Sequence, residues 1–587
     1  MPETGNSAAM ISDSMEKISV ALAGPWWNAL TYLAPRKYPE GVRVRVPVGN
    51  GGRVGIVLGG YEGEDDYGGE LKDISAVIDS EPILPRFMMP MIRWFSETYL
   101  CGFGTAMKTL LPVNFLAGDA LERDAARPQH MSEDGGAARP DLFLYEPRDP
   151  VRLDRCAQLL SDGLPSLICF PVYDAAKAFA DRMGGRAFLY PRSGAAAEWR
   201  AWNTLLSGDT CNVVIGGQAA AVAPVPGLAR IIVEDESNNA WRTLRPPVFN
   251  VRSLLSKRAR IEGASLVLAG RMPSSRAYRM LGASGGAAAS EAEARSGGGK
   301  NFLFVDMRLA YSPSVKGVQD TLAVSEPLVR ETEAAINRGS WTLWILDRKG
   351  YAGEILCEEC GGAICCAKCG GAMRWEISPG PSGRLVCGVC RAHESVPVSC
   401  PNCSGRLLTA KRPGLEALLP LARSALTGPV PILMMTGDDK APLRAAPGPG
   451  LVIGTRAALS FCDLADVGLV GWIDVDGEAR SQEYDARARA FGLVWESRWR
   501  DMVKNTDDRR VLLQTRRPGR EWQRGLVADR PSSPGWAVFW RDELRERAEF
   551  SMPPFASLVK IEASAADARP LTASFDASRL EYWLSDS

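Results

Sequence analysis

Histidine is nearly absent from this chain of 587 residues, which contains only His130 and His393. Two imidazoles are too few for zinc sites built from histidine, and any catalytic triad that needs histidine would have to use one of them. The chain also lacks a net charge, because 69 basic residues balance 69 acidic ones. This balance excludes a protein that coats nucleic acid through its overall charge, although it allows a local basic face.

Long apolar segments are missing as well. The sequence contains no uncharged run of about 18 apolar residues. Its first residues, Met1–Gly5, are not a basic segment that leads into an apolar one. We therefore expect a cytoplasmic protein without a membrane partner. The length predicts roughly three or four domains of 100–200 residues each.

Cysteine is concentrated in one region. Nine of the fourteen cysteines lie between Cys357 and Cys403, and eight of these form four C-x2-C pairs. A two-residue spacer lets both thiolates of a pair face one tetrahedral cation, and four thiolates complete a closed structural site. A disulfide framework is the alternative, but thiols stay reduced in a chain without a secretory signal. The pattern therefore predicts two structural Zn²⁺ ions.

The spacing also predicts which pairs share an ion. The 17 residues between the second and third pairs match the usual zinc-ribbon arrangement, so the outer pairs are left for each other. The predicted inner site is Cys366, Cys369, Cys387 and Cys390, and the predicted outer site is Cys357, Cys360, Cys400 and Cys403. Cys365 is left over, and we interpret it as a bystander.

Hydrophobic patterns divide the rest of the chain into α/β units. Residues 42–58 alternate apolar and basic residues around an Asn-Gly turn, which predicts a hairpin in a small β-rich domain. Two later regions contain continuous apolar runs between helical stretches, as buried parallel strands do. The predicted divisions are a β-rich domain (17–115), a linker (116–141), a first lobe (142–280), a second linker (281–300), a second lobe (301–356 and 404–550) with the zinc module (357–403) inserted after its first strand, and a short C-terminal segment (551–587).

Several stretches carry a more specific signature. The cysteine module follows Asp347–Tyr351 and ends in Val398–Cys403. The N-terminal region contains Tyr38–Pro47, Leu71–Ile74 and Asp79–Pro82. Met552–Phe555 follows the second lobe. With these motifs, nearly the whole chain resembles the PriA family of bacterial replication-restart proteins, also called primosomal protein N′. The resemblance implies an N-terminal DNA-binding domain, two RecA-like helicase-type lobes and the inserted two-zinc module. The sequence departs from the family in two places: a linker, residues 116–141, stands where the family carries a winged-helix domain, and the segment after Phe555 is shorter than the family's usual C-terminal domain.

In that family the N-terminal domain captures the 3′ end of a nascent strand with an aromatic-Asp-Tyr element, a glycine and a lysine. Gly49 and Lys72 fall on the matching positions, and Arg43 and Arg45 lie on the basic hairpin. We expect these four residues to contact DNA. The aromatic-Asp-Tyr element reads Leu30-Thr31-Tyr32 here. A neutral threonine is a weaker hydrogen-bond partner than a carboxylate, so the sequence leaves recognition of the 3′ end open.

The motifs of a DNA-unwinding motor are degenerate. A phosphate-binding loop needs G-x4-G-K-[ST], but the corresponding stretch 144–152 has no glycine and two prolines. The Mg²⁺ motif reads Glu234-Asp235-Glu236-Ser237 instead of Asp-Glu-Glu-His, the coupling motif at 269–274 lacks its threonine, and the arginine-finger motif ends in Val503. Together these changes remove the phosphate cradle and charge stabilisation. We therefore assign no catalytic residue and expect no helicase activity; the sequence leaves binding of ATP and Mg²⁺ open.

The favoured hypothesis is a primosomal restart protein that binds forked or branched DNA and helps to reload the replicative helicase without unwinding DNA itself. By resemblance, its partners are forked or single-stranded DNA, primosome proteins, single-strand-binding protein and the replicative helicase. One alternative is an active ATP-dependent 3′-to-5′ helicase whose nucleotide site includes Asp235 and Glu236. The other is a zinc-dependent protein-interaction module that does not bind DNA.

Overall fold

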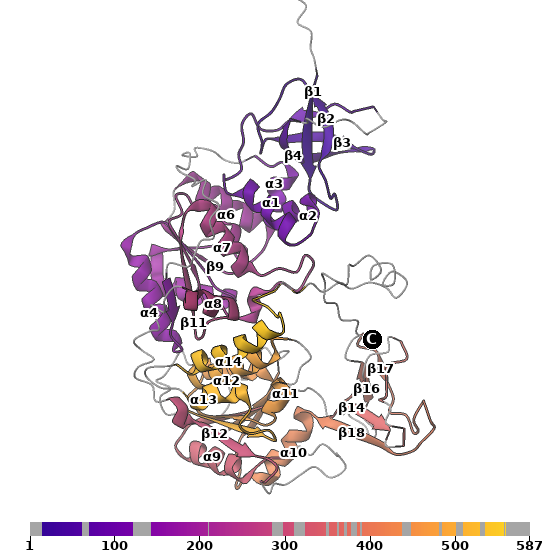
Figure 1. Cartoon of the computed structure of the whole chain (residues 1–587), viewed down its shortest axis with the longest axis vertical. Coiled ribbons are helices and arrows are strands. Elements are labelled where there is room, and N and C mark those ends of the chain that lie inside the picture. The colour runs from indigo at the N-terminus through magenta and orange to yellow at the C-terminus, as the bar shows by residue number, and fades with distance from the viewer. Residues whose placement is uncertain are drawn as a thin grey trace, which may run out of the picture.

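The computed structural model describes residues 15–60, 70–120, 142–208, 211–283, 298–309, 323–347, 352–357, 359–360, 363–368, 373–376, 384–387, 390–436, 448–479, 484–500, 509–528, 534–556 and 558. These residues form four sheets. Figure 1 shows the N-terminal domain at the top, two α/β lobes below it, and a small module beside the lower lobe. This arrangement confirms the predicted multidomain architecture.

The N-terminal domain is an antiparallel sheet followed by three helices. Its strand order is β2-β1-β4-β3-β5, and the predicted hairpin is present as the pair β3/β4, closed at Val48 and Gly51. The strands are β1 (Glu16–Leu22), β2 (Leu30–Ala34), β3 (Arg43–Val48), β4 (Gly51–Gly60) and β5 (Ala76–Val77), and the helices are α1 (Met88–Thr98), α2 (Phe103–Leu110) and α3 (Val113–Ala117).

The first lobe is a parallel sheet of order β6-β11-β10-β7-β9-β8. Its strands are buried on both faces, as continuous runs of valine and isoleucine require. The strands are β6 (Leu142–Tyr145), β7 (Ser166–Cys169), β8 (Phe188–Leu189), β9 (Val213–Gly216), β10 (Arg230–Val233) and β11 (Ser265–Gly270). The helices are α4 (Asp149–Leu159), α5 (Tyr173–Met183), α6 (Ala195–Ser207), α7 (Val251–Glu262) and α8 (Ser275–Ala283).

The second lobe repeats this plan with the order β12-β22-β21-β13-β20-β19. Its strands are β12 (Phe302–Asp306), β13 (Trp341–Ile345), β19 (Ile432–Met435), β20 (Leu451–Gly454), β21 (Val467–Trp472) and β22 (Arg510–Thr515). Its helices are α9 (Glu326–Asn337), α10 (Leu415–Ala425), α11 (Val475–Ala479), α12 (Ala486–Trp499), α13 (Glu521–Val527) and α14 (Gly535–Glu549).

The cysteine module, which we define as strands β14–β18, leaves this lobe between β13 and α10. It is a sheet of order β17-β16-β15-β14-β18, with β14 (Ala352–Cys357), β15 (Met373–Glu376), β16 (Arg384–Cys387), β17 (His393–Glu394) and β18 (Leu408–Pro413). Strands β14 and β18 pair as a two-stranded arm that carries the module away from the lobe (Figure 1). The predicted insertion after the first strand of the lobe is wrong, because β12 precedes β13 in the same sheet.

The predicted linkers and C-terminal segment lie largely outside the described residues. Helix α3 ends at Ala117, helix α8 extends to Ala283, and a 3-10 turn begins at Gly298. The divisions of the chain that we placed between these elements therefore stay predictions.

The two lobes share one apolar core, which also contains side chains of the N-terminal domain. Trp536 of α14 packs against Tyr145 at a ring-centroid distance of 5.8 Å and edge-on against Tyr278 at 6.0 Å. Two further indoles donate hydrogen bonds across the interface, Trp540 to the Pro273 carbonyl at 2.8 Å and Trp495 to the Arg271 carbonyl at 3.3 Å. The lobes are therefore joined by buried aromatic side chains.

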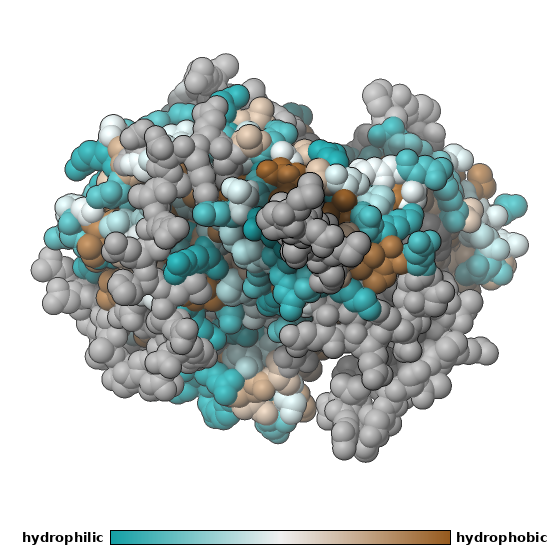
Figure 2. Space-filling model, turned by 90° about the horizontal axis from the view of Figure 1, so that it is seen from above, coloured by the Kyte–Doolittle hydropathy of each residue, from teal (hydrophilic) through white to brown (hydrophobic). Residues whose placement is uncertain are grey.

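The N-terminal domain is fixed to the first lobe in the same way. The Arg258 guanidinium of α7 lies 4.1 Å from the ring centroid of Phe87, and Phe249 packs edge-on against Phe95 at 4.9 Å. The coloured atoms in Figure 2 are mainly hydrophilic, and apolar residues gather there in small patches. Among the described residues, no helix is both long and apolar enough to cross a membrane.

Candidate functional site

The position of a phosphate-binding loop, between β6 and α4, is filled by the protein's own charges. Glu146 follows β6 and is fully buried. Its carboxylate accepts hydrogen bonds from the backbone N–H and the side-chain Nε of Arg148, both at 3.0 Å. Backbone N–H groups before a helix are a common anion site. Here an internal carboxylate already occupies the amide of Arg148.

Arg152, one turn into α4, reaches back into this position. Its side chain is 2% exposed and donates from Nε and Nη2 to Glu234 at 2.9 and 2.7 Å. Nη2 also donates to Asp149 at 2.5 Å, and Nη1 donates to the Glu146 carbonyl at 2.7 Å. The first acidic residue of the degenerate Mg²⁺ motif is therefore bound to an arginine of the same chain.

Arg271 extends these contacts towards the second lobe. Its Nη2 donates to Asp149 at 2.5 Å, and its Nη1 donates to Asp235 at 3.2 Å. The same Nη1 lies 3.9 Å from Glu496 of α12. Glu496 in turn accepts a hydrogen bond from Arg500 at 2.6 Å.

Arg500 then pairs with Asp463 at 2.7 Å. The alternating series of carboxylates and guanidiniums therefore runs through both lobes, and we call it the interlobe charge chain. Its members in order are Glu234, Arg152, Asp149, Arg271, Glu496, Arg500 and Asp463. Arg500 falls within the degenerate arginine-finger motif, whose last position, Val503, lies outside the described residues.

Glu236, the last acid of the Mg²⁺ motif, is also fully engaged. It accepts hydrogen bonds from the Tyr145 hydroxyl at 3.0 Å, the Ser274 backbone N–H at 2.6 Å and Arg252 Nη1 at 2.6 Å. Asp235 accepts a further bond from Asn238 at 2.7 Å. All three acids predicted to form a degenerate nucleotide site are therefore held by groups of the protein itself.

Burial and the neighbouring arginines set the protonation of these acids. Burial raises the pKa of Glu234 to about 7, against the opposing attraction of Arg152. Burial also acts on Asp149, but Arg271 and Arg152 outweigh it and lower the pKa of that carboxyl to about 2. A triphosphate here would meet five buried carboxyl groups, and no phosphate-binding loop would offset their charge. The arrangement therefore disfavours nucleotide binding.

Two of the N-terminal residues predicted to contact DNA, Gly49 and Lys72, lie near Tyr32 and Leu33. The Tyr32 hydroxyl donates to the Pro47 carbonyl at 3.1 Å, two residues before Gly49, which is exposed with a φ of 55°. The next backbone N–H, of Leu33, donates to the Lys72 carbonyl at 3.0 Å. The side chain of Lys72 is exposed, as is that of Arg45. Gly49 and Lys72 therefore lie close to each other and are accessible to a ligand, and Arg45 is exposed on β3.

Arg43 does not belong to this surface. Its side chain is 1% exposed and pairs with Asp79 at 2.8 Å. The guanidinium also donates to the carbonyls of Phe115 and Asp119, and it stacks on the Phe115 ring at 4.5 Å. The predicted DNA contact of Arg43 is therefore wrong, because this arginine fastens the sheet to the segment that follows α3.

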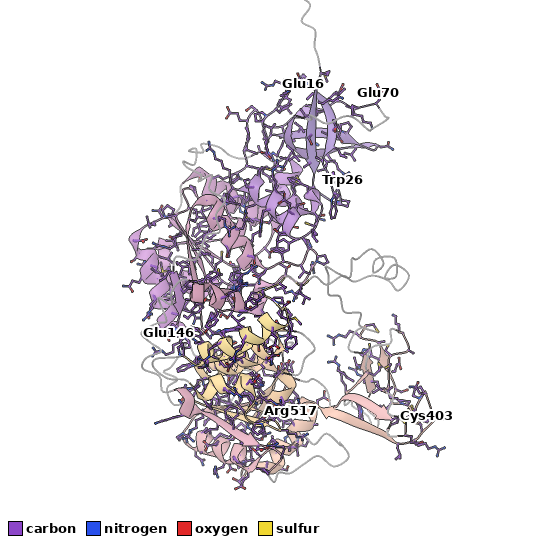
Figure 3. All side chains as sticks on the ribbon, viewed as in Figure 1. Glu16, Trp26, Glu70, Glu146, Cys403 and Arg517 are labelled. Atoms are coloured by element: carbon purple, nitrogen blue, oxygen red, sulfur yellow. The ribbon has the colours of Figure 1, made fainter. Side chains whose placement is uncertain are left out.

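The structure brings the outer cysteines together as one group. The sulfur atoms of Cys357, Cys360, Cys400 and Cys403 all lie within 4.8 Å of one another. Two of these contacts are 3.6 Å (Cys357 to Cys403) and 3.7 Å (Cys360 to Cys400). Ser404, directly after the last pair, has a φ of 61°, a left-handed conformation that turns the chain there. Figure 3 labels Cys403 at the outer end of the module.

Cys366, Cys387 and Cys390 form a second group of the same kind. The sulfur atoms of Cys366 and Cys390 are 3.7 Å apart. Cys369, the fourth predicted ligand, lies outside the described residues. The Cys365 thiol is exposed and points to the Ala363 carbonyl instead.

Both groups have the dimensions of a zinc site. Four thiolates at 2.3 Å from a tetrahedral ion lie about 3.8 Å apart, close to the shortest sulfur distances found here. Among its described residues, the module buries a small core of Ile355, Ile364, Cys366, Met373, Leu385 and Cys387. Two metal ions would supply the folding energy that so few buried side chains lack.

A basic surface in the second lobe was missed from the sequence. Arg517, Arg520 and Arg524 follow β22 and are all exposed. None of them forms an ion pair with another described residue. Figure 3 shows Arg517 on the side of the lobe from which the arm of the cysteine module extends. The four arginines among residues 516–524 were the available signal, and the zero net charge of the chain concealed it.

The raised pKa of Glu234 makes stability depend on pH. In the folded state the Glu234 carboxyl keeps its proton up to about pH 7, whereas in the unfolded chain it loses the proton near pH 4.5. The free energy of unfolding should therefore fall by on the order of 3 kcal/mol as the pH rises between these values. Glu234→Gln should remove this part of the pH dependence, measured as urea midpoints from pH 5 to pH 8.

Asp181→Asn is the matched control, because Asp181 forms an exposed ion pair with Lys177. We expect this variant to keep the pH profile of the unchanged protein. A Glu234→Gln profile that runs parallel to that of the unchanged protein would contradict the assignment.

The chain is similar to known proteins in both a domain and its overall sequence. Residues 19–112 match the family model of the 3′ DNA-binding domain of PriA. The replication restart protein PriA of Treponema pallidum is 22% identical over 569 residues, which cover 89% of this chain and 82% of that protein. The probable PriA of Deinococcus radiodurans is 25% identical over 77% of this chain, and the PriA of Bacillus subtilis is 21% identical over 70% of it.

The chain spans 47% of the length of the Deinococcus protein and 51% of the Bacillus protein. Among solved structures, the E. coli DExH-box NTPase HrpB matches with a TM-score of 0.32 and 11% identity, over 65% of this chain and 40% of that one. We draw nothing about the fold from this low TM-score; the fold is assigned from the two parallel sheets. The chain is therefore similar to PriA replication restart proteins over most of its sequence, and its residues 19–112 match the 3′ DNA-binding domain of PriA.

Proposed function

We propose that this protein binds forked or branched DNA and serves as a scaffold for primosome assembly, without unwinding DNA itself. The observation that carries this proposal is the interlobe charge chain. Arg152 and Arg271 occupy the position between the lobes where a motor of this fold binds nucleotide. The motor function requires a phosphate cradle and charges that are free to stabilise the transferred phosphoryl group.

The contact between the lobes supports the same conclusion. A nucleotide-driven motor converts binding and hydrolysis into movement of one lobe against the other. Here that movement would separate Trp536 from Tyr145 and break the contact between Arg271 and Glu496. The resulting loss of apolar burial and of charge pairing favours one fixed arrangement of the lobes.

DNA contacts are proposed on two surfaces. Gly49 and Lys72 lie at one end of the N-terminal sheet with Arg45 on its strand β3, and Arg517, Arg520 and Arg524 form the basic surface of the second lobe. Exposed cations without internal partners are suited to phosphate oxygens, and such contacts weaken as salt rises. The two surfaces lie on different domains, which suits a branched ligand with more than one arm.

We also propose that the cysteine module holds two Zn²⁺ ions in closed sites. Such ions fix a shape and leave no coordination position for substrate. The two-stranded arm presents the module away from the lobes (Figure 1). This position suits the binding of primosome proteins, single-strand-binding protein or the replicative helicase, which are the partners that the family resemblance implies.

Fork binding without ATP turnover is the central prediction. Anisotropy with a labelled fork should show binding that weakens with salt, whereas the same preparation should show no DNA-stimulated ATP hydrolysis. Binding on that preparation serves as the control for folding. Turnover that disappears in Asp235→Asn/Glu236→Gln would sink the scaffold proposal in favour of an active helicase, and absence of any fork binding would favour a protein-interaction module.

The metal content of single variants tests the two zinc sites separately. We expect two zinc ions per chain by elemental analysis, and one in either Cys403→Ser or Cys390→Ser, because each variant opens a different site. Cys365→Ser is the matched control, and it should keep both ions. Loss of an ion in this control, or loss of both ions in each site variant, would contradict the assignment of ligands.

The salt dependence of fork binding tests the basic surface of the second lobe. Arg517→Ala/Arg520→Ala/Arg524→Ala should reduce the slope of log affinity against log salt by roughly 0.7–0.9 for each phosphate contact removed. Arg541→Ala/Arg545→Ala is the control, because both arginines are exposed and pair with Asp542. Equal slopes for the triple variant and the unchanged protein would place the DNA elsewhere.

A further inference from the structure

The loop between β1 and β2 displays a tryptophan that the fold does not bury. Trp27 is 63% exposed, although tryptophan is usually largely buried in a monomer. Its neighbour Trp26 is partly buried. An exposed indole at a fixed position is a typical feature of a binding surface.

The backbone beneath these side chains is held firmly. The N–H of Phe103 donates to the Trp27 carbonyl at 3.0 Å, and the N–H of Gly104 donates to the Trp26 carbonyl at 3.1 Å. A Cβ atom at Gly102 would lie 2.6 Å from the Trp26 carbonyl oxygen, and one at Gly104 would lie 2.2 Å from the Leu22 carbonyl oxygen. Only glycine permits this close approach of α2 to the loop, so the exposed indole is presented on a preorganised support.

The loop lies at the same end of the sheet as Gly49. Leu22, the last residue of β1, pairs with Gly55 of β4, so the part of the hairpin before Gly55 extends beyond β1 on the side of the loop. Arg53, in that part of the hairpin, lies 5.1 Å from the ring centroid of Trp26 and is exposed. Figure 3 shows Trp26 at this end of the domain, next to the helices.

We propose that Trp27, supported by Trp26 and Arg53, is a stacking platform for unpaired bases of single-stranded DNA. A flat aromatic surface next to an exposed cation matches the two parts of a nucleotide, because the indole stacks on any base and the guanidinium neutralises a phosphate. Bases within a duplex already stack on their neighbours, so the platform favours unpaired nucleotides. The inference rests on the proposed DNA binding and adds a contact to the Gly49 and Lys72 surface.

The nearby Leu100 is 68% exposed, so an apolar protein partner is the competing occupant. The basic neighbour Arg53, which lies against Trp26, favours the nucleic acid. Substitution by an aliphatic residue separates the two, because leucine preserves apolar contact but offers no aromatic face. An exposed position also makes these variants safe for folding.

The test compares the affinities of Trp27→Ala, Trp27→Phe and Trp27→Leu for a labelled fork with a single-stranded 3′ arm. Trp27→Ala should weaken binding roughly five- to a hundredfold, as loss of base stacking does. Trp27→Phe should stay close to the unchanged protein, and Trp27→Leu should resemble Trp27→Ala. Affinity for a blunt duplex should not change in any variant. Phe550→Ala, at a residue that is 59% exposed in the second lobe, is the control.

The outcomes separate this inference from the proposed function. Equal fork binding by Trp27→Ala and the unchanged protein would overturn the platform and leave DNA binding intact. Normal binding by Trp27→Leu would overturn stacking and indicate an apolar contact. If the unchanged protein binds no DNA, both proposals fail. Replacement of the unpaired bases by abasic sites should remove the difference between the unchanged protein and Trp27→Ala.

Discussion

The pairing of Arg152 and Arg271 with buried carboxylates is the constraint on which the rest of the structure depends. A buried guanidinium without a partner is strongly destabilising, so each charge in the interlobe charge chain requires the next. The interlobe charge chain begins in the first lobe at Glu234 and ends in the second lobe at Asp463. It therefore defines both what the space between the lobes contains and how the lobes are aligned.

Apolar packing reinforces this alignment. Trp495, Trp536 and Trp540 bring the second lobe onto the first, and Phe87 and Phe95 bring the N-terminal domain onto the same core. These three parts act as one body, on which the Gly49 end and the Arg517 surface keep fixed positions. The cysteine module is different, because its small core is its own and a two-stranded arm attaches it to the lobe. The protein thus combines one continuously packed body with a module that has its own core.

The sequence predicted those features that short-range spacing encodes. The two-residue spacer of a C-x2-C pair brings its two sulfur atoms together, and the Asn50-Gly51 turn determines where the hairpin reverses. Both features could therefore be predicted without knowledge of tertiary contacts. Arg43 was misjudged because its partner Asp79 lies 36 residues away, and nothing local reveals that pair. The loss of the phosphate loop was visible as missing glycines, but its replacement by Arg152 and Arg271 was not, because Arg271 meets Asp149 across 122 positions of the chain. The exposure of Trp27 depends on the approach of α2, which adjacent tryptophans alone do not predict.

The interlobe charge chain also bears on how such a protein can change over generations. To create a phosphate-binding loop here, glycines and a lysine would have to be introduced before α4, and Arg152 and Arg271 would have to be removed at the same time. Loss of Arg152 alone would leave the buried Glu234 without its guanidinium partner, at a cost of about 3–5 kcal/mol, a large part of the stability of a typical domain. After loss of Arg271, by contrast, Asp149 would keep Arg152 and Glu496 would keep Arg500. Substitution of one member of the interlobe charge chain therefore affects its neighbours as well. The proposed absence of a nucleotide site would for this reason be hard to reverse by single substitutions.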